Sequence, residues 1–236
     1  MIINQFMAKG TLNIFTDASI YEDEGIVYGC PGYCCVVTDE QGNNTIIDKG
    51  YTIIQDSSNN ESELYAILMG VRKGAELRNQ FNTVNLFSDS RISILTLKEW
   101  IFNWYKIKRK EDLLINTSGK EVKNQNVILE IIHTICNNNL DINLYHQKGH
   151  VNIASLEPVD NAKKVFKDSN NVLITTEEVT KLSNYNNYID NYTRDNLKNT
   201  LFDKNSNYEY LNVKGNIIHF KSTFNINKYK SLVNYQ

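Results

Sequence analysis

Two hydrophobic periodicities follow one another along the first third of the chain, and their order restricts the possible folds most strongly. Apolar and polar residues alternate in Thr11–Asp17, and Gly32–Thr38 and Thr45–Ile54 are also strand-like, so we predict three strands. The short turn 39–44 joins the last two strands and favours antiparallel pairing. Apolar residues then recur every three or four positions between Asn60 and Arg78, which predicts an amphipathic helix.

Strands and helices continue to alternate up to about residue 150. We predict strands over 84–89 and 142–146, and helices over 91–110 and 124–136. Three antiparallel strands followed by this alternation describe an α/β domain, in which a mixed five-stranded sheet is flanked by helices. We assign this domain to residues 9–201.

The last third of the chain is less regular. Segment 151–183 is polar and holds two weak helical patches, which begin near Asp160 and Thr176, and we interpret it as an insertion in the domain. A final helix is predicted over 186–201. Residues 202–236 are interpreted as a C-terminal extension, to which the sequence assigns no role.

Charge and cysteine content narrow the environment and the partners of the chain. The formal net charge is only −2, so any binding of nucleic acid must come from a local basic patch. No apolar run is long enough to cross a bilayer, and the N-terminus lacks the pattern of a secretory signal. The spacing of Cys30, Cys34, Cys35 and Cys136 fits no C-x-x-C pair, which predicts reduced, partly buried thiols. We expect a cytoplasmic monomer without a membrane partner; the sequence names no protein partner.

The positions of two aspartates suggest a metal site. Asp17 ends the first predicted strand, and Asp89 ends the fourth in the same way. If these strands are neighbours, the two carboxylates converge, and their repulsion is relieved most simply by a divalent cation. A site made only of oxygen atoms selects Mg²⁺ or Mn²⁺ over zinc. The alternative is that each aspartate merely caps the turn or helix that follows it.

Seven short segments, taken together and in this order, resemble type 1 ribonuclease H. They are Leu12–Ser19, Ser58–Ala66, Phe87–Ser90, Trp100–Trp104, Gly119–Asn124, His146–His150 and Asn186–Asp190. The resemblance covers roughly residues 9–150 and 184–200, and it implies a ribonuclease H-like fold. The segment 151–183 and the C-terminal extension have no counterpart in the basic plan of that family.

The resemblance implies roles for five residues. Four of them stand where the family has its metal-binding carboxylates, and the fifth stands at the position of its loop histidine: Asp17, Glu63, Asp89, Asp190 and His150. Helical periodicity places both Glu61 and Glu63 beside the apolar stripe and does not choose between them. The Glu-Leu-x-Ala pattern of the family selects Glu63. Asp195 competes with Asp190 for the fourth position, because the long insertion precedes both.

The activity implied by the resemblance is hydrolysis of the RNA strand of RNA–DNA hybrids, which leaves 5′-phosphate and 3′-hydroxyl ends. Two Mg²⁺ ions, for which Mn²⁺ can substitute, would bind the scissile phosphate between them. By this mechanism Asp17 bridges both ions, Glu63 and Asp89 hold the first, and Asp190 holds the second. His150 would relay a proton or assist product release.

Contacts to the hybrid are predicted on either side of the acidic residues. Ser58, Asn59 and Asn60 precede the first helix and could bind a phosphate, sugar or base, although Ser58 or Asn59 could instead only cap the helix. An aromatic pair and a basic cluster follow the fourth strand and resemble the basic protrusion of the family: Trp100, Trp104, Lys106, Lys108, Arg109 and Lys110. The alternatives are core packing for the two tryptophans and a solvated charge run for the cations.

Two other functions remain open at this point. A DNA nuclease or resolvase of the same fold would use a similar set of carboxylates. A non-catalytic member of the fold would bind nucleic acid without cleaving it. The intact set of four acids argues against the second alternative.

Overall fold

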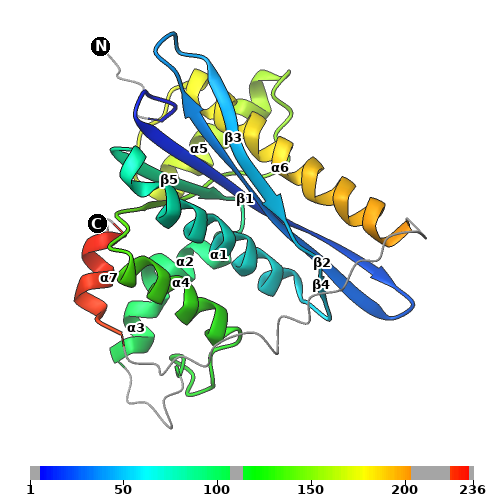
Figure 1. Cartoon of the computed structure of the whole chain (residues 1–236), viewed down its shortest axis with the longest axis vertical. Coiled ribbons are helices and arrows are strands. Elements are labelled where there is room, and N and C mark those ends of the chain that lie inside the picture. The colour runs from blue at the N-terminus through cyan, green and yellow to red at the C-terminus, as the bar shows by residue number, and fades with distance from the viewer. Residues whose placement is uncertain (1–5, 107–113, 203–223, 234–236) are drawn as a thin grey trace.

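A mixed β-sheet forms the centre of the molecule in the computed structural model, which describes residues 6–106, 114–202 and 224–233 (Figure 1). Along the sheet the strand order is β3-β2-β1-β5-β6. The strands are β1 (Thr11–Asp23), β2 (Ile26–Thr38), β3 (Asn44–Tyr51), β5 (Thr83–Ser88) and β6 (Asn143–His146). The first three pair antiparallel, whereas β5 is parallel to β1 and β6 is parallel to β5. The predicted α/β fold is therefore confirmed, with one addition: the short strand β4 (Ile54–Gln55) pairs with β2 as a sixth strand.

The hairpin of β1 and β2 is longer than the sequence predicts. Both strands have 13 residues and meet at a two-residue loop, in which Glu24 and Gly25 have φ angles of 46° and 80°. Positive φ at both loop residues is the geometry of a type I′ turn, whose twist matches that of the paired strands. Glu24 is an unusual residue for this position, which explains why the turn was not predicted.

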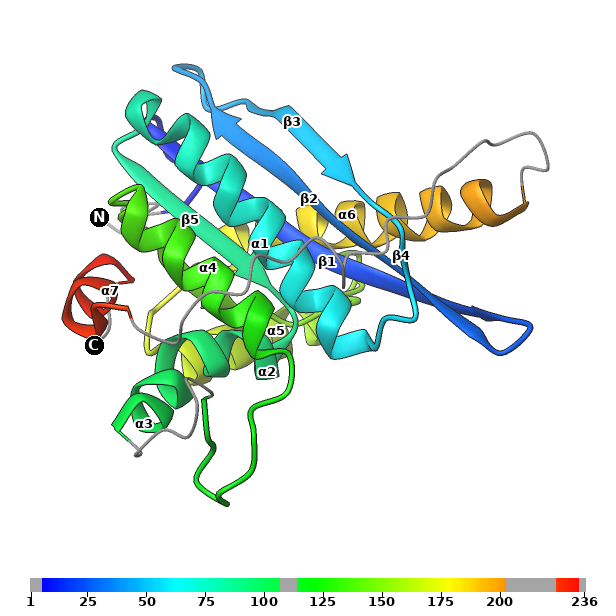
Figure 2. The same ribbon diagram turned by 60° about the horizontal axis from the view of Figure 1, so that its bottom comes forward.

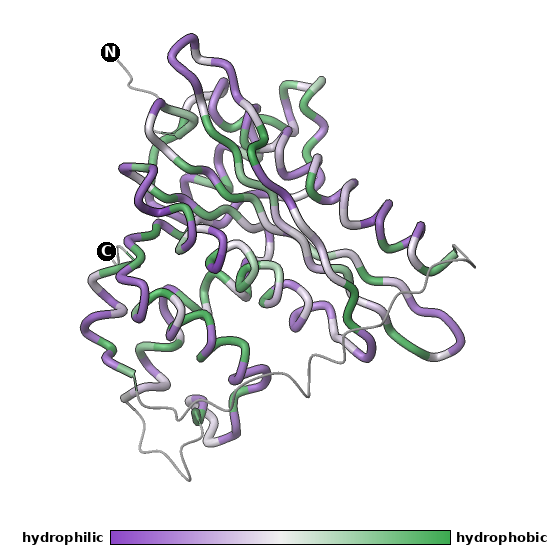
Figure 3. Tube along the Cα trace, viewed as in Figure 1, coloured by the Kyte–Doolittle hydropathy of each residue, from purple (hydrophilic) through white to green (hydrophobic). Residues whose placement is uncertain are grey.

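Two layers of helices cover the two faces of the sheet (Figure 1, Figure 2). Helices α1 (Asn59–Leu77) and α4 (Gln125–Asn137) lie on one face, and α5 (Leu156–Asn170) and α6 (Thr176–Phe202) lie on the other. Hydrophobic residues follow the strands and the inner sides of the helices, whereas the turn between β2 and β3 is hydrophilic (Figure 3). Among the described residues, none of the helices combines the length and the apolar character needed to cross a membrane. All four cysteines are buried and unpaired, as expected.

Helix α6 lies very close to the hairpin. The Thr193 hydroxyl is 2.9 Å from the Ser19 hydroxyl on β1, and a Cβ atom at Gly32 on β2 would lie 2.6 Å from the Thr193 methyl group. A glycine is therefore required where the helix crosses β2. This close packing sets the position of Asp190, one turn before Thr193.

The predicted helical patch near Thr176 and the predicted final helix over 186–201 form one continuous helix, α6. The predicted start near Thr176 is confirmed, whereas the predicted break before residue 186 is wrong, so the predicted insertion 151–183 ends inside α6. Thr175 and Glu178 explain the start: each side chain hydrogen-bonds to the backbone N–H of the other, at 3.1 Å in both cases. This is a capping box, and its Thr-x-x-Glu pattern is a sequence signal for a helix that begins here.

The helix predicted over 91–110 is interrupted. It consists of α2 (Arg91–Leu95), a π-helical turn η2 (Thr96–Trp100) and α3 (Ile101–Lys106). In a π-helical turn the backbone hydrogen bonds are displaced by one residue. The carbonyl of Leu97, within this turn, accepts a hydrogen bond from the Tyr229 hydroxyl at 2.9 Å.

Tyr229 belongs to α7 (Ile226–Leu232), a helix in the C-terminal extension that the sequence did not predict. Its side chain is completely buried and packs on the Phe102 ring. The extension also covers part of the sheet edge, because the backbone N–H of Ile142 donates to the Leu232 carbonyl at 2.9 Å. Residues 224–233 thus complete the core beside α4.

We expect Tyr229→Phe to lower the free energy of unfolding by about 1–3 kcal/mol, since the Leu97 carbonyl loses its partner in a buried position. Chemical denaturation measures this change. Tyr65→Phe is the matched control, because the buried Tyr65 hydroxyl has no hydrogen-bond partner in the described part of the chain. Equal destabilisation by both variants would contradict a specific role for the Tyr229 hydroxyl.

Candidate metal centre

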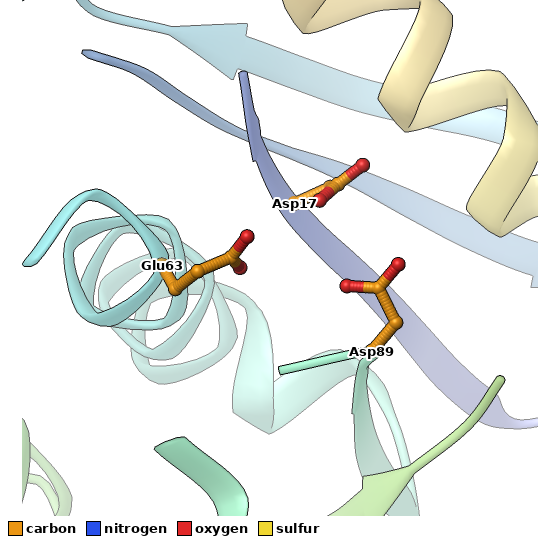
Figure 4. Close-up of side chains that lie close together, drawn as sticks. All are labelled: Asp17, Glu63 and Asp89. Atoms are coloured by element: carbon orange, nitrogen blue, oxygen red, sulfur yellow. The ribbon is translucent and has the colours of Figure 1, made fainter. Parts of the chain in front are cut away.

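Three acidic side chains from three different elements meet beside the sheet (Figure 4). Asp17 lies on β1, Glu63 on α1, and Asp89 directly after β5. One ligand oxygen from each lies within 4.8 Å of the others. The two aspartates are neighbours because β1 and β5 pair in parallel up to Thr16 and Ser88, the residues that precede them. The predicted convergence of Asp17 and Asp89 is confirmed. The prediction that Asp17 ends its strand is wrong, because β1 continues to Asp23 in its long hairpin with β2.

The structure also distinguishes Glu63 from Glu61. Glu63 is 5% exposed and points into the acidic cluster, whereas Glu61 lies at the exposed start of the helix and lines a different cavity. The Oε2 atom of Glu63 is buried and has no hydrogen-bond partner among the described residues. A buried carboxylate oxygen without a donor is costly unless a cation or a proton satisfies it.

The raised pKa values of the three acids also indicate a site for a cation. Burial raises the pKa of Asp17 well above its usual value, and the Asp89 carboxylate raises it further. Burial and then Asp17 raise the pKa of Glu63 in the same way. Burial also raises the pKa of Asp89, although a hydrogen bond from Asn186 lowers it. Three carboxyl groups that resist ionisation together form a site that a divalent cation stabilises, and their all-oxygen chemistry fits Mg²⁺ or Mn²⁺.

Asp190 and His150 complete the rim of the cluster. His150 Nδ1 is 3.3 Å from Asp190 Oδ2, and Arg194 Nη2 lies 2.6 Å from the same oxygen. The negative charge of Asp190 raises the pKa of both Asp17 and Asp89, so it acts on the same centre.

The alternative acid at this end of the chain, Asp195, lies elsewhere. It is exposed on α6 and is not among the residues that line the acidic cavity. Of the two candidates that the sequence left open, the structure places Asp190 at the cluster.

The loop that carries His150 lies in direct contact with the acidic cluster. A Cβ atom at Gly149 would overlap with the Asp89 carboxylate, so only glycine allows the backbone to approach this closely. The next residue, His150, has a φ of 51°, in the left-handed region, and its side chain is 75% exposed. The imidazole is therefore free to contact a substrate at the mouth of the site.

The four acids line a cavity of about 530 Å³. Its walls come from β1, the start of α1, the loop after β6 and both helices of the second layer. Besides the four acids, they include Ala18, Asn59, Ser90, His146, Gln147, Lys148, Gly149, His150 and Val165. Val165 belongs to α5, so the inserted helix forms part of this wall.

The predicted contacts before α1 lie at the surface. Ser58 caps the helix by accepting a hydrogen bond from the Glu61 backbone N–H at 3.3 Å, and it remains exposed, as do Asn59 and Asn60. Asn59 lines the acidic cavity, and Asn60 lines a neighbouring cavity of about 290 Å³. Ser58 can cap the helix and still be exposed for binding of the substrate, so both of these predicted roles remain possible for it.

The two tryptophans line the same neighbouring cavity. The ring centroids of Trp100 and Trp104 are 6.1 Å apart, and both rings are half-buried; Trp104 also packs against the core. Lys106 has a described backbone but no described side chain. Lys108, Arg109 and Lys110 lie outside the described residues. The basic patch therefore stays a prediction.

Sequence reasoning assigned no role to Asn186, which hydrogen-bonds to the Asp89 carboxylate, or to Gln147, which hydrogen-bonds to Asn186. Asn186 donates from Nδ2 to Asp89 Oδ2 at 3.2 Å, and Gln147 donates from Nε2 to Asn186 Oδ1 at 2.8 Å. Asn186 lies in the predicted Asn-x-x-x-Asp pattern, four residues before Asp190, and this spacing was the available signal.

This sheet, with an acidic centre beside the middle of β1 and the end of β5, defines an RNase H-like α/β protein whose centre can bind metal ions. A family model described as RNase H matches residues 9–166. The chain belongs to the RNase H family, a family of ribonuclease enzymes. The match ends inside α5, before the helix that carries Asp190.

Several solved structures are similar to this chain at low sequence identity. The foamy viral protease–reverse transcriptase in complex with an RNA/DNA hybrid is 16% identical, with a TM-score of 0.50, over 70% of this chain and 21% of the viral chain. The PFV RNase H domain is 17% identical (TM-score 0.49; 71% and 99% covered). RNase H1 from Halobacterium salinarum NRC-1 is 15% identical (TM-score 0.40; 59% and 86% covered). The chain thus spans about a fifth of the first of these proteins. No curated protein matches the sequence.

Proposed function

We propose that this protein hydrolyses the RNA strand of RNA–DNA hybrids and uses two Mg²⁺ ions, for which Mn²⁺ can substitute. The observation that carries the proposal is the buried cluster of Asp17, Glu63 and Asp89, with the unpartnered Glu63 oxygen, in a chain of the RNase H family. The hybrid as substrate is supported by a neighbour of the same fold that was solved with an RNA/DNA hybrid.

In this proposal four acids bind the metal ions and one histidine transfers protons. Asp17, Glu63, Asp89 and Asp190 would hold the ions, with Asp17 shared between them. When bound, the ions would supply an activated water and would stabilise charge on the leaving 3′-oxygen, so that the products carry 5′-phosphate and 3′-hydroxyl ends. His150 would move protons at its exposed imidazole, since it lies at the mouth of the cavity beside Asp190.

Binding of the hybrid would extend from the acids along the start of α1. Asn59 lines the acidic cavity, while Asn60, Trp100 and Trp104 line the cavity next to it, so one strand can contact both. Ser58 and the first backbone N–H groups of α1 would bind a phosphate. The cluster of Lys106, Lys108, Arg109 and Lys110 would supply the positive charge that a protein of net charge −2 otherwise lacks.

The working unit that we propose is residues 9–201, because α6 brings Asp190 to the acids and packs on β1 and β2. The extension 202–236 would then support this unit through α7. A cytoplasmic monomer remains our prediction, which size-exclusion chromatography and localisation of the tagged protein test.

The test compares four substrates: an RNA–DNA hybrid, duplex DNA, duplex RNA and single-stranded RNA. Each is incubated with Mg²⁺, Mn²⁺ or a chelator. We expect cleavage of the RNA strand of the hybrid with either ion and none with the chelator. Cleavage of duplex DNA alone would favour a DNA nuclease or resolvase of the same fold. A protein that binds the hybrid but cleaves nothing would be a non-catalytic member.

A further inference from the structure

The last turn of the inserted helix α5 holds the residue at the end of strand β6. Asn170 accepts a hydrogen bond from the His146 backbone N–H at 2.9 Å and donates to its backbone carbonyl at 2.7 Å. The Ser169 hydroxyl lies 2.8 Å from His146 Nδ1. Both the backbone and the ring of His146 are thus held by two consecutive residues of α5.

The ring of His146 reaches from α5 to the metal centre. The side chain is buried, with 8% exposure, and lines the acidic cavity together with Asp89. Strand pairing places His146 in register with Ser88, so its ring lies within hydrogen-bonding reach of the Asp89 backbone. A neutral imidazole has one N–H and one acceptor nitrogen, so it can donate to the Asp89 carbonyl and accept from the Ser169 hydroxyl at the same time.

Asp89 lies one residue beyond the end of β5. Ser88 is the last residue of that strand in register with Thr16 of β1 and with His146 of β6, so His146 stands beside the position from which the Asp89 side chain leaves the sheet. The carboxylate is held by Asn186, through its Nδ2 atom, at 3.2 Å. Of these two supports, His146 acts on the backbone of Asp89 and Asn186 on its side chain.

We propose that Ser169 and His146 form a positioning pair, which connects the inserted helix to the backbone of Asp89 and holds this carboxylate ready for metal binding. In this proposal neither residue is a ligand of the metal or of the substrate. The proposal rests on the proposed function, since it assigns Asp89 to the metal centre. It also gives part of the predicted insertion 151–183 a role in the reaction.

The test is Ser169→Ala, which removes one hydroxyl and leaves the helix intact. We expect the Mg²⁺ concentration for half-maximal cleavage to rise about 10-fold, the range seen when residues behind metal ligands are changed. The KM for the hybrid should stay the same at saturating Mg²⁺. Ser169→Thr, which keeps the hydroxyl, should restore the metal requirement of the natural protein.

A second readout does not depend on activity. Binding of Mn²⁺, measured by calorimetry and by the rise in Tm, should weaken by a similar factor in Ser169→Ala. The control is Val159→Ala, which removes buried apolar contacts from the same helix. It should lower the Tm of the metal-free protein without changing the affinity for Mn²⁺.

The outcomes separate this proposal from the proposed function. If Ser169→Ala keeps the natural affinity for Mn²⁺, or if Val159→Ala weakens it equally, the positioning pair is rejected. If the natural protein binds Mn²⁺ but does not cleave hybrids, the proposed function fails, while the binding measurements still decide on the pair. If the natural protein binds no Mn²⁺, both proposals fall.

Discussion

Replacing Asp17 with asparagine is expected to abolish cleavage of the hybrid while the protein remains folded. Asp17 is the most central acid of the cluster, since its pKa is raised by burial and then by Asp89, with a further contribution from Asp190. Losing one shared metal ligand forfeits several kcal/mol of electrostatic stabilisation, and about 4 kcal/mol corresponds to a loss of about 1,000-fold in rate. Single-turnover cleavage of a labelled hybrid at saturating Mg²⁺ measures the effect.

The same variant should be more stable than the natural protein when metal is absent. The folded pKa of Asp17 lies above its unfolded value, so the folded state binds more protons between the two. The free energy of unfolding therefore falls as the pH rises through this window, and above it the penalty of the buried charge is complete. Asparagine carries no charge and avoids the penalty.

Thermal unfolding in a chelator checks this sign. The Tm of Asp17→Asn should exceed that of the natural protein at about pH 7.5, and the difference should shrink toward about pH 4, where ordinary carboxyl groups become protonated. Added Mg²⁺ should raise the Tm of the natural protein more than that of the variant. An active variant, or one that unfolds at a lower temperature in the chelator, would show that Asp17 does not belong to a metal centre.

The second large effect is expected at Asp190. Asp190→Asn should reduce the cleavage rate by about 100-fold or more, because the proposed fourth metal ligand and the partner of His150 are lost together. The ion pair with Arg194 is also lost, so circular dichroism should accompany the kinetic measurement. The concentration of Mg²⁺ for half-maximal activity should rise as well.

Asp195→Asn is the matched control for this prediction. At 100° per residue, Asp195 is turned by about 140° around α6 from Asp190, and its side chain is exposed. The variant should cleave hybrids at the natural rate. A reversed result, with Asp195→Asn inactive and Asp190→Asn active, would transfer the fourth position to Asp195.

Much of the fold was predictable because its signals are local. Alternation in β1 and the apolar stripe of α1 are properties of adjacent residues, and the sheet order follows from parallel pairing of β5 with β1. The long β1–β2 hairpin was predicted too short, because it depends on a Glu-Gly turn that carries no strong signal. Helix α7 was missed because Tyr229 is buried by residues far away in the sequence.

For the centre itself, the sequence determined that Asp17 belongs to the first strand and that Asp89 follows the fourth, since strands are encoded locally, and parallel pairing of β1 with β5 brings the two acids together although Asp17 lies in the middle of β1. Only the tertiary structure decided which glutamate of α1 joins them, because helical periodicity allows both and burial distinguishes them. Only the tertiary structure shows that Asp190, and not Asp195, lines the acidic cavity, because a long inserted segment hides the register of the last helix until α6 is packed on the hairpin. The link from Ser169 through His146 to Asp89 likewise exists only after folding, since its members are separated by 23 residues and more along the chain.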